Sequence, residues 1–196
     1  MTGKEALQLF RFGQMQKNKQ LPNPLPIFID KKELNERVVE IFQGNKEPIG
    51  YQEIIKRLYE RKKQDLGNYY LLNIQRGEIK DFDYVSSFRY EMKMSIEAIF
   101  SNKSIEIDNI FKFEQEIVKR IFSNQLAQQT KTGGLRLRYF EDIENNQYIR
   151  PTMFQLVMKY RKPFYDYIYK SQTQAINPGI FHDIMRNGIL DDLRQD

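Results

Sequence analysis

The sequence has no cysteine and no tryptophan, and His182 is its only histidine. Without cysteine the chain cannot form disulfides, thiolate zinc sites or iron–sulfur clusters, and it has no cysteine nucleophile. Sites built on paired histidines are excluded in the same way. We therefore expect no metal and no cofactor, and we expect a reducing compartment, the cytoplasm, as the location.

Long apolar runs are also missing. A membrane-spanning helix needs about 20 consecutive apolar residues, and no segment of this sequence approaches that length. The N-terminus places Lys4, Glu5 and Arg11 around a short apolar cluster that does not form a signal-peptide core. The sequence predicts neither secretion nor contact with a membrane.

The chain contains enough apolar surface for a core of its own. It has 196 residues, of which 40% are hydrophobic, and a chain of this length buries about 70% of its unfolded surface. One domain, or one domain with an appendage, is expected. Residues 1–29 are predicted to be an extended, proline-containing connector, because Pro22, Pro24 and Pro26 favour polyproline II backbone.

Two helices are predicted after this connector. Asp30 and Glu33 have the spacing of a capping box, and apolar residues then recur at helical intervals up to Gly44, which suits a C′ position. This pattern predicts a helix over 31–43, and a similar apolar face predicts a second helix over roughly 50–64.

A β-hairpin is predicted between residues 68 and 85. Tyrosine, leucine and isoleucine, which favour strands, lie on both sides of a turn signal at Arg76 and Gly77. Residues 30–85 therefore form a second segment, made of helices plus a β-hairpin.

The third segment, residues 86–196, is predicted to be helical to its end. Apolar residues at helical spacing mark a helix around 92–100, a longer helix from Ile107 that ends before Gly133, and a short helix near 138–145. A fourth helix opens at Pro151 and has a kink or break at Pro163. The last helix is capped by Asn177 and Pro178 and is interrupted at Gly188. The expected fold class is mainly α: a C-terminal bundle of four or five helices preceded by two helices and a β-hairpin.

Positive charge is concentrated in two parts of this third segment. The net charge of the chain is +5, but residues 119–140 alone contain five bases and no acid, and residues 150–170 contain five bases against Asp166. Clustered cations attract phosphate backbones without base-specific contacts. The candidate nucleic-acid-binding residues are Lys119, Arg120, Lys131, Arg136, Arg138, Lys159, Arg161 and Lys162.

Two other interpretations of these stretches stay open. The cations can belong to an ordinary solvated surface. The run 160–169 mixes bases with aromatic residues, which either stack on unpaired bases or fill the core of the bundle.

A metal-dependent nuclease is the alternative function. Asp65, Glu78 and Lys80 match the order of residues in nucleases whose carboxylates hold Mg²⁺ and whose lysine orients the attacking water. Alternation in a hairpin places Glu78 and Lys80 on one face without any catalytic purpose. His182 and Asp183 spell the dipeptide of a phosphohydrolase class, but the further histidines of that metal site are missing.

The aromatic hairpin and the basic C-terminal segment together resemble a known family. Residues 68–73 and 79–85, followed by a basic helical C-terminus, are similar to the C-terminal part of the large subunit of type I-B CRISPR Cascade complexes. The helical part also resembles the Cascade small subunit. The resemblance covers residues 30–196 and includes no catalytic motif.

The resemblance implies a non-catalytic role in antiviral defence. The expected partners are guide RNA, target DNA and the backbone and large subunits of Cascade, and the chain would brace the assembly and hold the target and displaced strands by their backbones. Cleavage would belong to a separate nuclease-helicase. Large subunits of this family are much longer than 196 residues, so PAM reading is not expected of this chain. The remaining alternatives are the nuclease and a protein-only helical adaptor.

Overall fold

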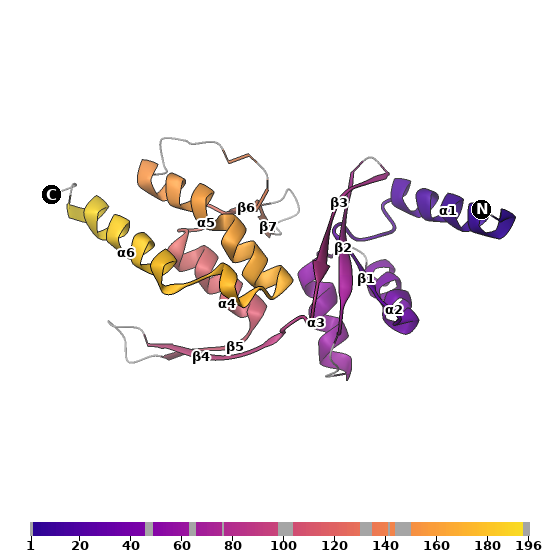
Figure 1. Ribbon diagram of the computed structural model, residues 1–196, viewed down its shortest axis with the longest axis horizontal. Coiled ribbons are helices and arrows are strands. Elements are labelled where there is room, and N and C mark those ends of the chain that lie inside the picture. Colours follow the sequence, from indigo (N-terminus) through magenta and orange to yellow (C-terminus); the bar gives the residue numbers. More distant parts are fainter. Residues whose placement is uncertain are drawn as a thin grey trace. The chain divides into compact units, whose positions relative to one another are not determined.

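A computed structural model describes residues 2–45, 49–62, 66–75, 77–97, 104–129, 135–140, 142–143 and 150–193, with the backbone alone at 61–62, 75, 129 and 135–136. The chain divides into two compact units, Met1–Phe88 and Arg89–Asp196 (Figure 1). Each is described by itself.

The first unit is built on a three-stranded antiparallel sheet. Strands β1 (Leu25–Phe28), β2 (Tyr69–Gln75) and β3 (Glu78–Val85) lie in the order β1-β2-β3. The tight turn between β2 and β3 uses Gly77, whose φ of 81° is readily adopted by glycine. The predicted hairpin is therefore confirmed, and the sheet gains one strand, β1, that was not predicted.

Two helices cover one face of this sheet. Helices α2 (Lys32–Gln43) and α3 (Tyr51–Lys62) agree with the predicted ranges. Asn35 on α2 bonds both the main-chain nitrogen and the main-chain oxygen of Phe28, at 2.7 and 2.9 Å, and the hydroxyls of Tyr51 and Tyr69 join α3 to β2. The buried core includes Phe28, Val38, Ile54, Ile55, Leu58, Tyr69, Leu71 and Val85.

The capping box predicted for α2 is wrong. Its N-cap is Lys31, which makes no side-chain cap, and Asp30 has a positive φ of 55°. The segment is instead held by the bonds between Asn35 and the end of β1. A true capping box lies at Thr2 and Glu5, at the start of α1 (Gly3–Lys17).

The prediction of a connector over residues 1–29 is also corrected. Residues 3–17 form α1, which has no buried residue and extends away from the sheet (Figure 1). Residues 25–28 form β1, because Pro26 lies on an edge strand, where a missing N–H is tolerated.

The second unit mixes helices with strand pairs, and the predicted bundle of four or five helices is not what it forms. Strands β4 (Glu91–Glu97) and β5 (Ser104–Asn109) pair in antiparallel fashion where the sequence predicted helix. The described part of the chain is therefore mixed α and β, with six α-helices and small antiparallel sheets.

The predicted long helix from Ile107 is much shorter in the structure. Asn109 caps α4 (Ile110–Glu116) by accepting from the main-chain nitrogens of Phe111 and Lys112. A π-helical turn, η1 (Ile117–Ile121), follows. Ser123 and Asn124 then take positive φ values of 46° and 61°, which end the helix and direct the chain into β6 (Ala127–Gln129), paired with β7 (Leu135–Leu137).

Two long helices complete the second unit. Helix α5 (Pro151–Lys170) has Pro151 at its start, as predicted, and it continues as one helix through Pro163, where a kink or break was predicted. A 3₁₀ turn, η2 (Thr173–Ala175), leads to α6 (Pro178–Leu193), which Asn177 caps through the nitrogen of Ile180 and which Gly188 does not interrupt. The short helix predicted near 138–145 is absent at 138–140 and 142–143, and its other positions lie outside the described residues.

Candidate nucleic-acid interface

The structure brings the two basic stretches together in the second unit. Phe122, which follows η1, makes an edge-to-face contact with Phe164 of α5, with 5.4 Å between ring centroids. Tyr139, which follows β7, contacts Tyr165 at the same centroid distance. Arg161 Nη1 donates a hydrogen bond of 3.1 Å to the main-chain oxygen of Arg138. Segments separated by about 20 to 40 residues of sequence therefore form one cluster.

Lys119 is the most available of the predicted cations. It lies exposed on η1 and has no carboxylate partner among the described residues. Its neighbour Arg120 pairs with Glu116, an acid that lies just before the stretch 119–140 and was therefore left out of the sequence count. The two adjacent bases thus differ in how much charge they present to a ligand.

Arg138 and Arg161 carry positive charge and also form hydrogen bonds that hold the fold together. Arg138 Nη2 donates to the main-chain oxygen of Gln125 at 3.1 Å, which ties the strand pair to the turn after η1. Its Nε is buried and has no hydrogen-bond partner in the described part of the chain. Arg161 in turn holds the main chain at Arg138. Both side chains are half-buried, so their charges are fixed in position.

Lys159 is held by α6. The Asp183 carboxylate accepts from Lys159 Nζ at 2.8 Å, from the Tyr160 hydroxyl and from Asn187 Nδ2 at 3.0 Å. The hydrogen bonds from Lys159 and Tyr160 lower the pKa of Asp183, and the carboxylate raises the pKa of Lys159. The ammonium group is therefore charged at neutral pH, but its charge is compensated.

Lys162 belongs to a cluster of two lysines and one carboxylate on α5. Asp166 lies 2.5 Å from Lys162 Nζ and 3.1 Å from Lys170 Nζ. The Asp166 carboxylate is thus shared by two lysine ammonium groups. Lys162 is 63% exposed, whereas Lys170 and Asp166 are only 17% and 13% exposed, so Lys162 is the member of this cluster that a ligand can reach.

The remaining predicted cations cannot be placed. Lys131 lies outside the described residues, and only the backbone of Arg136 is described. The structure thus brings Arg138 and the end of η1 against the middle of α5, where Arg161 lies. It also shows that nearby acids compensate Arg120 and Lys159.

The aromatic residues between 160 and 169 mostly pack inside the unit. Tyr160, Phe164, Tyr165 and Tyr169 are buried, and the rings of Tyr165 and Tyr169 are stacked with 4.7 Å between centroids. These rings are therefore core residues and are not open to unpaired bases.

An exposed aromatic face that the sequence analysis did not single out lies on the hairpin of the first unit. Tyr70, Phe82 and Tyr84 are 38%, 58% and 47% exposed, and Tyr70 contacts both other rings at centroid distances of 5.8 and 5.4 Å. Register explains their grouping, because Tyr70 lies opposite Tyr84 and Phe82 is two residues away on the same face. The sequence signal for this exposed face is the aromatic residue at every second position of the strand, at Phe82 and Tyr84.

The second unit also contains a buried carboxylate. Glu114 on α4 is 2% exposed and accepts a hydrogen bond of 2.6 Å from the Tyr139 hydroxyl. Burial, together with the Glu114 charge, raises the pKa of Tyr139 well above its ordinary value. The hydroxyl stays protonated at neutral pH and fixes the segment that carries Arg138.

The residues of the nuclease alternative do not form a visible metal site. Glu78 and Lys80 lie exposed on β3 and pair with each other, while Asp65 lies outside the described residues. Within the ranges that the structure describes, no group of three or more acidic or histidine side chains is placed to hold a metal ion.

None of the described helices is long and apolar enough to cross a membrane. No protein family matches the sequence, and neither a curated protein nor a solved structure is similar to the chain.

Proposed function

We propose that the chain is a non-catalytic subunit of a type I CRISPR RNA-guided surveillance complex, where it braces the assembly and binds guide RNA and target or displaced DNA through their backbones. The observation that carries the proposal is the grouping of both basic stretches in one unit, through the contacts of Arg161 with Arg138 and of Phe164 with Phe122. The resemblance of the hairpin and the C-terminal segment to the Cascade large subunit supports the choice of complex.

The cations favour backbone contacts over base recognition. Long lysine and arginine side chains bind phosphate by charge, and such contacts carry no sequence information. Lys119 is exposed and has no acidic partner among the described residues, and Lys162, which is 63% exposed, adds a second reachable cation on α5. Lys159 contributes only if a phosphate displaces Asp183. The surface therefore suits a strand that other subunits and base pairing position.

In this proposal the chain cleaves nothing. Cleavage is the task of a separate nuclease-helicase, and Glu78 and Lys80 form an exposed ion pair on a strand. Incubation with Mg²⁺ or Mn²⁺ should leave single- and double-stranded DNA and RNA intact. Metal-dependent cleavage that Glu78→Ala abolishes would contradict this proposal and support the alternative function, a metal-dependent nuclease.

Assembly tests the proposal directly. The chain would be co-expressed with a type I-B guide RNA and the backbone and large subunits, and the complex isolated through a tag on the backbone subunit. The chain should co-elute with the guide RNA in a fixed ratio. Elution of the chain alone and free of RNA, with the other subunits assembled, would contradict the proposal.

A further inference from the structure

Helix α6 carries an apolar stripe that no described residue covers. Met185, Ile189 and Leu193 recur every fourth residue, so they lie on one side of the helix, and they are 64%, 57% and 67% exposed. Three neighbouring exposed apolar side chains on one helix face are typical of a surface that binds a partner.

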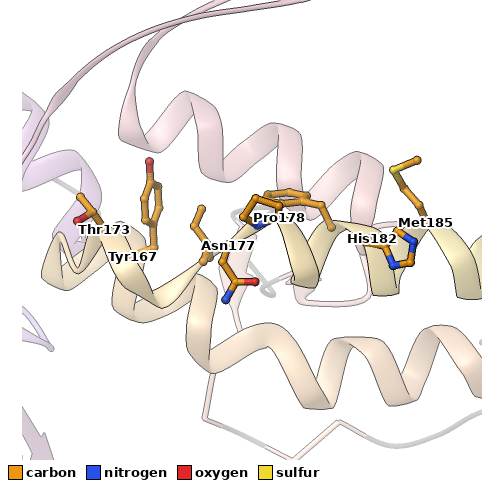
Figure 2. Close-up of a pocket in the computed structure, with 8 residues that line it drawn as sticks. Tyr167, Thr173, Asn177, Pro178, His182 and Met185 are labelled. Atoms are coloured by element: carbon orange, nitrogen blue, oxygen red, sulfur yellow. The ribbon is translucent and has the colours of Figure 1, made fainter.

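A hollow continues this stripe at the N-terminal end of the helix. It has a volume of about 650 Å³ and is lined mainly by apolar surface from Tyr167, Ile176, Pro178, Phe181 and Met185. Figure 2 shows the labelled side chains following one line, from Thr173 and Tyr167 past Asn177 and Pro178 to His182 and Met185. A partner that lies along the stripe can therefore insert an apolar side chain into the hollow.

The other side of α6 is already occupied by α5. Phe181 contacts Phe164, with 6.0 Å between ring centroids. All three acidic residues of the helix bond to α5 or to the residue before it: Asp183 to Lys159, Asp191 to the Thr152 hydroxyl at 2.7 Å, and Asp192 to Arg150 at 2.7 Å. The carboxylates of α6 are thus engaged on the α5 side.

The outer side carries the positive charge of Arg186. His182 and Arg186 lie one turn apart beside the stripe, both are exposed, and neither has an acidic partner in the described part of the chain. On a helix, residues four apart are neighbours on the same face. The outer surface therefore combines apolar residues with positive charge along one flank.

We infer that this surface binds an acidic amphipathic helix of another protein. Apolar side chains at helical spacing would cover Met185, Ile189 and Leu193, one of them would enter the hollow, and carboxylates would lie beside Arg186 and His182. The stretch Pro178–Leu193 is about 24 Å long at 1.5 Å per residue, which matches a partner helix of about four turns.

Other occupants fit the surface less well. A second copy of α6 would offer no carboxylate to Arg186, because the aspartates of α6 are already bonded to α5 and to Arg150. Single-stranded nucleic acid prefers aromatic platforms for its bases, whereas this stripe consists of Met, Ile and Leu. The inference does not depend on the proposed nucleic-acid binding.

Synthetic peptides test the inference on the full chain. Two fluorescein-labelled helical peptides of 18 residues would share one leucine stripe and differ only in flanking Glu or Lys, with fluorescence anisotropy as the readout. The Glu peptide should bind with a dissociation constant on the order of 1–100 μM, as expected for a small interface, and at least tenfold more tightly than the Lys peptide. Arg186→Glu should reverse this preference.

Matched variants locate the site. Ile189→Asp should weaken the Glu peptide at least tenfold, while Ile79→Asp, which changes another isoleucine that is more than half exposed, should leave its affinity unchanged. Equal binding of both peptides, or binding that Ile189→Asp does not alter, would overturn the inference. So would self-association in sedimentation that Ile189→Asp abolishes, since a second copy would then cover the stripe.

Discussion

Phe122 is a central packing residue of the second unit, which contains both basic stretches. It is fully buried and lies edge-to-face with Phe164, with an interplanar angle of 88°. Truncation to alanine removes a buried ring and leaves a cavity, which costs about 3–5 kcal/mol. Roughly 0.5–1.5 kcal/mol of that reflects the aromatic pair itself. A domain is stable by only about 5–15 kcal/mol, so Phe122→Ala should remove a large part of the stability of the second unit.

Urea unfolding followed by circular dichroism at 222 nm measures this cost, and hydrogen exchange of α5 peptides assigns it to the second unit. The control is Phe10→Ala, the same substitution at a residue that is 64% exposed, which should cost less than about 0.5 kcal/mol. Equal m-values would show that the unfolding transition is unchanged. A loss below about 0.5 kcal/mol for Phe122→Ala would refute the packing of η1 against α5.

Two further predictions follow from single contacts, and a third follows from the exposure of helix α1. Tyr139→Phe removes the hydrogen bond that the hydroxyl donates to the buried Glu114 carboxylate, so it should cost about 1.5–3 kcal/mol in urea unfolding; a neutral result would contradict the bond. Asp183→Asn should destabilise the chain at pH 7 but not at low pH. The pKa of Asp183 in the folded chain lies below its ordinary value of 3.8, so the ionised carboxylate stabilises the fold above pH 3.8, and this stabilisation is lost as the pH falls through the folded-state pKa. Equal destabilisation at both pH values would exclude the ion pair. Removal of residues 2–17 should lower the helix signal without shifting the urea midpoint, since α1 has no buried residue.

Local signals in the sequence predict much of the first unit. Helices α2 and α3 have apolar faces at helical spacing, and the β2–β3 hairpin has strand-forming residues around Gly77. Asn177 and Pro178 mark the start of α6 for the same reason, because a cap acts within one helical turn. Each of these elements is determined by residues close to it in the chain.

The strands of the second unit depend on more distant residues. Met92 and Ile96 fit a helix, but with Met94 they also alternate as a strand does, and pairing of Ile96 with Ile105 decides between the two. Strand β1 was missed because Pro26 and the two prolines before the strand suggested a connector, although an edge strand accommodates Pro26. Propensity alone could not decide these cases.

The charges of the candidate interface show the same limit. Counting bases along residues 119–140 and 150–170 finds two stretches rich in positive charge, but it could not show which bases have acidic partners. Asp183 lies 24 residues from Lys159 in the sequence, yet it forms an ion pair with it. This ion pair becomes visible only when α6 is packed against α5. It makes Lys119 a stronger candidate for phosphate binding than Lys159.

The salt dependence of strand binding tests the central claim most directly. Affinity for two unrelated single-stranded oligonucleotides, one DNA and one RNA, would be measured by anisotropy from about 50 to 300 mM salt. The variants Lys119→Glu and Lys93→Glu make the same change of charge at exposed lysines of the second unit, one on η1 and one on β4. Each phosphate contact contributes about 0.7 to the slope of log affinity against log salt.

The prediction is that Lys119→Glu weakens both oligonucleotides by the same factor and flattens the slope by at least about 0.7, while Lys93→Glu leaves the slope unchanged. Absence of salt-dependent binding by the unmodified chain, or the same response of both variants, would contradict a nucleic-acid interface around η1 and α5.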